Sequence, residues 1–245
     1  MKYSFLRPKY QTNLIRLGSK NDGGYLVPEE VLYKTKILLS FGLNDDWSFE
    51  EDFKLKNKEV FIYSYDHTVD RKFWYKYTII SFFYFLKNFK NFSNIFKYLK
   101  YKNFFKLKFN NFHIKKKIVN KEYGFNEISI NKIAKKFKKD VFLKIDIEND
   151  EYRILDEIKN FKQLLGFVIE FHYVDLNYKI IKDFLSKNSN FKIVHIHPNN
   201  MGGLDTEGFP TTLEISFINT KLCKKYKLVN NKKFKPHLLD SNNDP

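Results

Sequence analysis

Residues 143–151 read Leu143-Lys144-Ile145-Asp146-Ile147-Glu148-Asn149-Asp150-Glu151, an apolar run that ends in carboxylates. The stretch 141–147 has the β-branched and aromatic content of a buried strand, and 150–159 has the apolar spacing of a helix. Open α/β sheets bind ligands outside the carboxyl ends of their strands, and Asp146 and Glu148 lie two apart on one face. Carboxylates there can bind ribose hydroxyls, accept a proton or ligate a metal. The stretch therefore predicts a ligand site whose chemistry the rest of the chain must decide.

The composition fits one domain covering residues 1–245. The formal charge is +16, which raises the question of a polyanionic partner. However, of 44 basic residues only Arg7, Arg16, Arg71 and Arg153 are arginine, the usual residue for bidentate phosphate and base recognition. We therefore do not expect nucleic acid as the main partner.

The cysteine content and the N-terminus favour a cytoplasmic protein. Cys223 is the single cysteine, which excludes an internal disulfide and a cysteine zinc site. Residues 1–8 lack the apolar core of a signal peptide, and no run reaches the ~18 apolar residues of a membrane span. We expect a cytoplasmic protein, with association at a membrane surface as an open alternative.

Short apolar segments that end in polar or glycine residues alternate with helical spacing. This alternation predicts a largely parallel α/β sheet, with the last strand antiparallel at or near an edge. The expected strands are 37–41, 60–65, 117–120, 142–147, 167–171, 193–196 and 212–218, and the expected helices are 47–56, 129–138, 150–161 and 176–186.

Residues 73–112 differ in composition from the rest of the chain, because phenylalanines alternate with lysines. We interpret this segment as a helical insertion whose aromatic side chains cap the substrate side of the sheet. Two alternatives remain open: a surface for peripheral membrane contact or a lipid-linked substrate, and a surface that stacks nucleic-acid bases.

The first strand ends at Gly42, where a residue without a side chain lets a ligand approach the backbone. The turn lacks the Gly-x-Gly-x-x-Gly and phosphate-loop patterns. The nearby acids Asp45, Asp46 and Glu50 would repel a pyrophosphate and attract a cationic ligand. Asp66 follows the second strand, where an acid can hold ribose hydroxyls.

Several blocks in this order resemble the FkbM-type and methyltransferase-like-24-type group of S-adenosylmethionine-dependent class I methyltransferases. The matching blocks are Arg16-Leu17-Gly18, Asp22-Gly23-Gly24-Tyr25, Ser40-Phe41-Gly42, Trp47-Ser48-Phe49-Glu50, Tyr65-Asp66-His67-Thr68, Leu143-Lys144-Ile145-Asp146-Ile147-Glu148 and Glu170-Phe171-His172. The resemblance implies a Rossmann-like, seven-stranded and mostly parallel sheet. The chain departs from the family pattern at Asn149, where the family commonly has glycine, and in the acid-rich turn at 44–46.

The resemblance also implies roles for these residues. Gly42 would line the methionine portion of S-adenosylmethionine, Asp66 would hold the ribose, and Asp146 would face the methyl group. Glu148 would contact the substrate. The other cofactor contacts implied are Asp22, Gly23, Gly24, Trp47 and Ser48.

Glu170 and His172 end the next strand with the same two-residue spacing. Neighbouring strands lie roughly 5 Å apart, so these side chains can meet Asp146 and Glu148 in one crevice. His172 has a reference pKa near 6.5 that suits a general base, and Asp146 or Glu170 could orient it or take the proton. The same set suits a divalent cation, although we favour a site without metal. His197, at the end of a later strand, is a candidate substrate contact, whereas His195 is more easily explained as packed.

We predict an S-adenosylmethionine-dependent O-methyltransferase that acts on a sugar hydroxyl of a surface glycan or its precursor. The family implies O-methylation, and the glycan is an extrapolation from it. The alternatives are a nucleic-acid methyltransferase, a non-catalytic module that binds a membrane or partner through 73–112, and a metal-dependent hydrolase. The sequence does not determine the oligomeric state.

Overall fold

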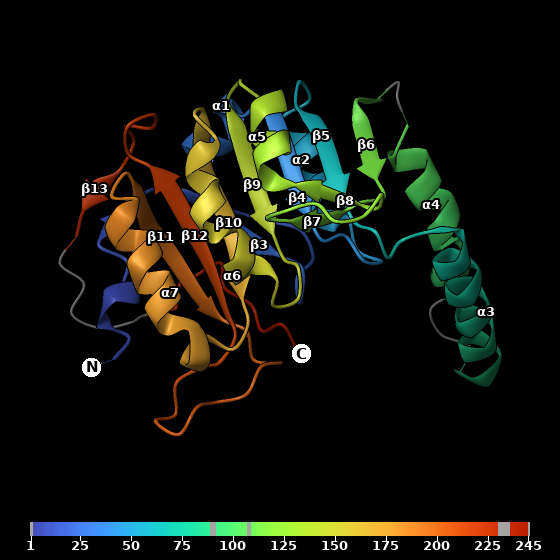
Figure 1. Ribbon diagram of the computed structural model, residues 1–245. Coiled ribbons are helices and arrows are strands. Elements are labelled where there is room, and N and C mark those ends of the chain that lie inside the picture. The colour runs from blue at the N-terminus through green and yellow to red at the C-terminus, as the bar shows by residue number, and fades with distance from the viewer. Residues whose placement is uncertain (1, 89–91, 107–108, 230–235, 245) are drawn as a thin grey trace.

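A seven-stranded sheet forms the centre of the computed structural model, which describes residues 2–88, 92–106, 109–229 and 236–244 (Figure 1). Its strands, in spatial order, are β6 (Asn111–Ile114), β5 (Phe61–Tyr65), β4 (Ile37–Phe41), β9 (Val141–Ile145), β10 (Leu164–Phe171), β12 (Leu213–Asn219) and β11 (Phe191–Pro198). Strand β12 is antiparallel to both neighbours, and the pairs from β6 to β10 are parallel. This order, with one reversed strand next to the edge, is that of the class I methyltransferase fold and confirms the predicted architecture.

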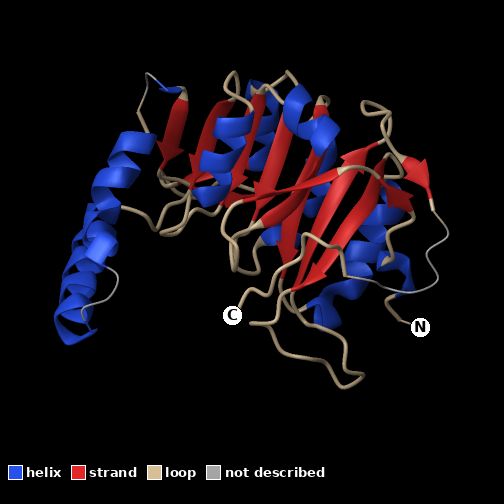
Figure 2. Ribbon diagram, turned by 180° about the vertical axis from the view of Figure 1, so that it is seen from behind, coloured by secondary structure: helices blue, strands red, loops and turns tan. Residues whose placement is uncertain are grey.

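Helices cover both faces of the sheet, because its strands are buried and apolar on both sides. Figures 1 and 2 show the two helical layers from opposite sides. One core lies under α5 (Ile130–Lys136), α6 (Glu151–Ile154), the 3₁₀ helix η4 (Leu155–Asn160) and α7 (Val174–Lys187). The other lies under α1 (Glu29–Lys34), α2 (Ser48–Lys56) and the antiparallel pair β2 (Leu14–Leu17) and β3 (Tyr25–Pro28). The smaller elements are η1 (Ser4–Leu6) and the pair β1 (Tyr10–Gln11) and β13 (Lys227–Leu228).

The 73–112 segment is helical over most of its length, but its last residues form an edge strand. Strand β6 pairs with β5, and Phe112 stacks on Tyr63 with 4.8 Å between ring centroids. The predicted helical segment therefore extends too far, because residues 111 and 112 belong to β6. Residues 117–120, expected to form a strand, form β7 (Lys117–Val119), which pairs with β8 (Glu127–Ser129) outside the main sheet.

The helices of this segment form what we call the helical arm, comprising α3 (Arg71–Asn88), η2 (Phe92–Phe96) and α4 (Lys97–Phe104). Figures 1 and 2 show the arm beyond the β6 edge, where α3 extends away from the sheet. Only its base is packed: Trp74 is buried in a small cluster with Leu43, Trp47 and Val69. The expected cap over the substrate side is therefore not formed by the described part of the arm.

Candidate functional site

A cleft of about 440 Å³ opens at the carboxyl ends of β4, β5 and β9. This is the point where the chain, having built β4, β5 and β6 in one direction, returns to build β9 on the other side of β4. Such a switch point leaves a crevice between diverging loops. The cleft is lined by residues 22–23, 42–46, 49, 65–68, 116–118, 144, 146–148 and 150.

Gly42 makes the closest backbone approach in this cleft. Its φ is +84°, and a Cβ atom there would lie 1.7 Å from the carbonyl oxygen of Asp146. Its amide donates to the carbonyl of Tyr65 at 3.0 Å. The turns after β4, β5 and β9 thus meet at Gly42, and only glycine fits there.

Asp66 organises the cleft loops through its carboxylate. One oxygen accepts the amides of Leu43 and Asn44, both at 2.9 Å, and the other accepts the amide and the hydroxyl of Thr68 at 2.7 and 2.6 Å. Burial opposes ionisation, but these hydrogen bonds outweigh it and lower the pKa of Asp66. Asp66 lines the cleft as predicted, and its four acceptor positions are already filled by the chain.

Lys144 places a buried cation in the cleft. Its Nζ donates to the carbonyl of Gly42 at 3.0 Å, and the side chain is 5% exposed. Burial disfavours the charge, but Glu50 and Asp146 outweigh burial and raise the pKa of Lys144. Burial in turn raises the pKa of Glu50, which accepts a hydrogen bond from Ser40. Lys144 therefore offsets part of the negative charge of the cleft.

The predicted meeting of the strand-end acids is present, and Tyr25 joins them. The hydroxyl of Tyr25 lies 3.1 Å from Asp146 Oδ2 and 3.2 Å from Glu170 Oε2, and Asn199 donates to Glu170 Oε1 at 2.8 Å. Burial and then Asp146 raise the pKa of Glu170. Because a tyrosine hydroxyl has one proton for two carboxyls, a protonated Glu170 that donates to the Tyr25 oxygen satisfies all three groups.

His172 lies beside these acids and is held from behind by Glu151. Glu151 Oε1 lies 3.1 Å from Nδ1 of His172 and accepts its backbone amide at 2.8 Å. On the other side Nε2 lies 3.6 Å from Glu148 and 3.8 Å from Glu170. Burial lowers the pKa of His172, but Glu151 and the other acids outweigh burial and raise the pKa. The acids thus raise the pKa of His172 to about 9, above the reference value used in the sequence analysis.

The turn after β9 carries Glu148 into solvent. Glu148 and Asn149 both have positive φ, at 53° and 76°, a backbone conformation that asparagine tolerates better than most residues. The Glu148 side chain is 88% exposed and lines the cleft. It is the acid in this group with the freest access to a second ligand.

The C-terminal residues cover the acids on the β12 side. Asn243 donates to Glu214 Oε1 at 2.6 Å and contacts His197 Nε2 through Oδ1 at 3.1 Å. Its carbonyl accepts the amide of Asp22 at 3.2 Å. His197, expected to contact substrate, is thus buried under Asn243, and His195 contacts Asp240 of the same segment at 2.9 Å. A direct substrate contact by His197 would require this segment to move.

Three of the predicted cofactor residues lie outside the described cleft lining. Trp47 is buried against Trp74 of the arm, Ser48 begins α2, and Gly24 packs against Ser19. Asp22, Gly23, Gly42, Asp66, Asp146 and Glu148 line the cleft. Glu170 and His172 are not in its lining. His172 lies 3.6 Å from the lining residue Glu148, and Glu170 is linked to the lining residue Asp146 through the hydroxyl of Tyr25.

Ligand atoms of Asp146, Glu170 and His172 lie within 4.8 Å of one another, as those of a metal site would. A second such group is Asp22, Glu170 and Glu214. However, the two oxygens of Glu170 already contact Tyr25 and Asn199, so a cation in either group would have to displace one of these contacts. The residues present therefore fit a cation poorly in this arrangement.

The sequence interpretation assigned no role to Tyr25, Lys144 or Glu151. Lys144 and Glu151 each left a signal: a lysine in the middle of a buried strand needs a charged partner, and Glu151 shares the apolar helix face of Leu155 and Ile158. Tyr25 left none, because its contact with Asp146 spans 121 positions.

No family model matches the sequence, and no curated protein is significantly similar to it. Several solved structures match most of the chain at low similarity. A fibrillarin/Nop5p complex is 14% identical, with 82% of this chain and 90% of that chain covered and a TM-score of 0.40. Precorrin-6y C5,15-methyltransferase from Geobacter metallireducens GS-15 is 13% identical, with 76% of this chain and 85% of that chain covered and a TM-score of 0.38. M. jannaschii TYW2 in complex with AdoMet is 10% identical, with 85% of this chain and 88% of that chain covered and a TM-score of 0.35. At these identities and TM-scores, function has to be argued from the site itself.

Proposed function

We propose that the protein is an S-adenosylmethionine-dependent methyltransferase. The observation that carries this proposal is the position and lining of the cleft, at the switch point of a class I sheet, with the Gly42 turn against the carbonyl of Asp146. A cleft of about 440 Å³ is in the size range of small-molecule sites. Its acids, among them Asp22, Asp46 and Asp146, suit a ligand that carries a sulfonium and an ammonium group.

Within the cleft, the methionine portion would lie beside Gly42 and Gly23, and the ribose would lie toward Asp66. Because the Asp66 carboxylate already accepts four hydrogen bonds, a ribose hydroxyl would share or displace one of these donors. Asp66 would then act mainly by holding the Leu43–Asn44 backbone in place for the cofactor.

When bound, S-adenosylmethionine supplies an electrophilic methyl group. Asp146 and Glu148 would orient an acceptor hydroxyl in line with that methyl, so that an O–C bond forms as the C–S bond breaks. The hydroxyl proton would pass to a carboxylate, or to His172 once that residue has lost its own proton. The products would be a methyl ether and S-adenosylhomocysteine.

We further propose a sugar hydroxyl as the acceptor, in a surface glycan or its precursor. Sugar hydroxyls donate hydrogen bonds, and the acids at the cleft can accept them: Glu148 is exposed, and Asp146 lies beside it. The same carboxylates would repel the phosphates of a nucleic acid, which weakens the alternative of a nucleic-acid methyltransferase.

Calorimetric titration with S-adenosylmethionine and S-adenosylhomocysteine tests the cofactor. We expect binding to the wild type and to Asp156→Ala, an exposed acid outside the cleft lining, and weaker binding to Asp66→Ala. A folded wild-type protein that binds neither compound would refute the proposal. Glycan mass spectrometry of a strain lacking the protein tests the acceptor, and the expected result is the loss of one CH₂ mass increment.

A further inference from the structure

The outer part of the helical arm is apolar and exposed on most sides. The side that carries Tyr77, Ser81 and Phe85 is half-buried, where Phe85 packs against Phe92. From Tyr77 to Leu86 the sequence of α3 has no charged residue. The exposed side chains in this run are Ile79 (38%), Ile80 (61%), Phe82 (47%), Phe83 (65%), Tyr84 (66%) and Leu86 (50%), and Phe92 (54%) and Phe96 (43%) follow in η2. A helix that is apolar all round is normally buried, so this surface calls for a covering partner.

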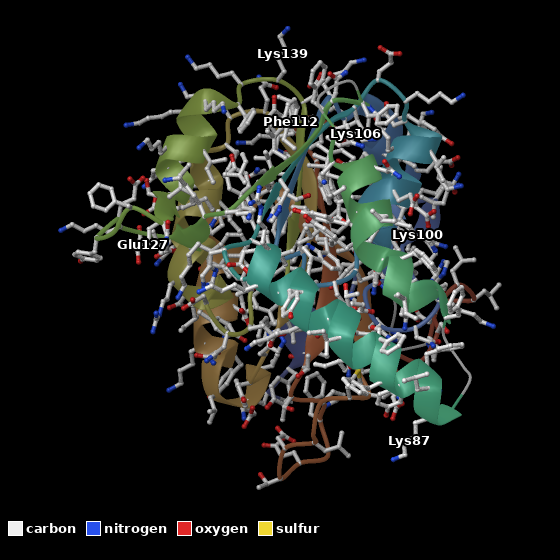
Figure 3. The ribbon with its side chains drawn as sticks, turned by 90° about the vertical axis from the view of Figure 1, so that its right-hand side faces the viewer. Lys87, Lys100, Lys106, Phe112, Glu127 and Lys139 are labelled. Atoms are coloured by element: carbon white, nitrogen blue, oxygen red, sulfur yellow. The ribbon has the colours of Figure 1, made fainter. Side chains whose placement is uncertain are left out.

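The charges of the arm indicate the chemistry of that partner. Residues 71–106 contain no Asp or Glu, and their basic residues lie on both sides of the uncharged run: Arg71, Lys72, Lys76, Lys87, Lys90, Lys97, Lys100, Lys102 and Lys106. Figure 3 shows Lys87 at the far end of α3 and Lys100 beside α4. Lys97 pairs with Asp45 at 2.6 Å, so one of these cations fastens the arm to the domain. An apolar surface bordered by lysines matches the apolar interior and anionic headgroups of a membrane interface.

Two other partners fit this surface less well. A nucleic acid would stack its bases on aromatic rings, but Ile79, Ile80 and Leu86 offer no ring, and no cation lies within the run to meet a phosphate. A second copy of the arm would bring two strongly basic surfaces together, and their repulsion opposes such a dimer. Within the described residues, no helix is long and apolar enough to cross a membrane.

We propose that the outer half of the helical arm inserts into the interface of an anionic membrane and holds the cleft near its surface. The base of the arm connects the arm to the cleft: Trp74 packs on Trp47, and Lys97 pairs with Asp45, which lines the cleft. A membrane bound by the outer half would therefore lie near the cleft. The inference goes beyond methyl transfer and does not depend on it. Cofactor titration tests the cleft, and vesicle binding tests the arm.

Flotation of the full chain with vesicles tests the inference. We expect binding to phosphatidylcholine vesicles that contain roughly 30% phosphatidylglycerol, and much weaker binding to phosphatidylcholine alone. Phe83→Asp should weaken binding at least about tenfold, and Leu55→Asp, at a 66% exposed leucine on α2, should leave it unchanged. Replacing Lys76 or Lys87 by Gln should weaken binding roughly fivefold each.

A fluorescence variant locates the contact. Phe83→Trp should shift its emission to the blue with anionic vesicles and be quenched by brominated acyl chains, whereas Trp74 is already buried. No flotation, equal losses for Phe83→Asp and Leu55→Asp, or the same blue shift with single-stranded RNA would each overturn the membrane assignment. So would a stable dimer that dissociates on Phe83→Asp. Equal urea midpoints for the two aspartate variants exclude misfolding as the cause.

Discussion

Replacing Asp66 by Asn should destabilise the protein as well as weaken cofactor binding. The amide would have one acceptor oxygen in place of two. Its best orientation keeps that oxygen toward the amides of Leu43 and Asn44 and turns its NH₂ toward Thr68. The Thr68 hydroxyl can rotate to accept, but the Thr68 amide loses its partner, and the bonds that remain lose the charge of the carboxylate.

The expected loss in unfolding free energy is about 3 kcal/mol, from one lost bond to a charged acceptor and two weakened ones. Urea unfolding followed by circular dichroism measures it. Asp70→Asn is the matched control, because that carboxylate is less buried than Asp66 and accepts only backbone amides, chiefly that of Phe73 at 2.8 Å. It should change stability much less. If the two variants lose the same stability, Asp66 does not organise the cleft loops in the way described.

The remaining predictions concern the Gly42 turn, the base and a buried acid. Gly42→Ala should lower the unfolding free energy by more than about 3 kcal/mol. Gly208 has a similar φ but nothing within 4 Å of a new Cβ, so Gly208→Ala should lower it by about 1 kcal/mol. Equal losses would contradict the close approach at Gly42. If His172 is the base, methyl transfer should rise with pH through a midpoint above 6.5, and Glu151→Gln should move that midpoint to lower pH; an unchanged pH–rate profile would exclude this pairing. Burial raises the pKa of Glu214 from 4.5 to about 7, so the folded state binds the extra proton, and its stabilisation, complete below pH 4.5, is lost as pH rises toward 7. Glu214→Gln should flatten this decline of about 3 kcal/mol in pH-dependent unfolding, and a decline as steep as in the wild type would assign it to another group.

Local patterns were sufficient for most of the strands and helices. The apolar runs predicted as strands at 37–41 and 142–147 are short, β-branched and followed by polar turns, and they form β4 and β9, although β9 ends at Ile145, two residues earlier than predicted. Asp146, Glu170 and His172 do lie close together, and Glu148 lies 3.6 Å from His172. However, β9 ends at Ile145, so the turn after the strand, and not the two-residue spacing of a strand, places Asp146 and Glu148. The sequence pattern did not predict the position of the helical arm. An amphipathic aromatic segment can cover its own sheet or an external surface, and its composition is the same in both cases.

By itself, then, the sequence determined the order of strands and helices and the strand ends that carry acids, because periodicity and turn residues act over a few positions. Only the tertiary structure decided how those acids behave. Tyr25 joins Asp146 and Glu170 across 121 and 145 positions, and Glu151 contacts His172 from α6, 21 positions earlier in the chain. The protonation of His172 depends on the sum of carboxylates that folding brings within a few ångströms of it. That sum is a property of distances in space, which the spacing of residues along the chain does not contain.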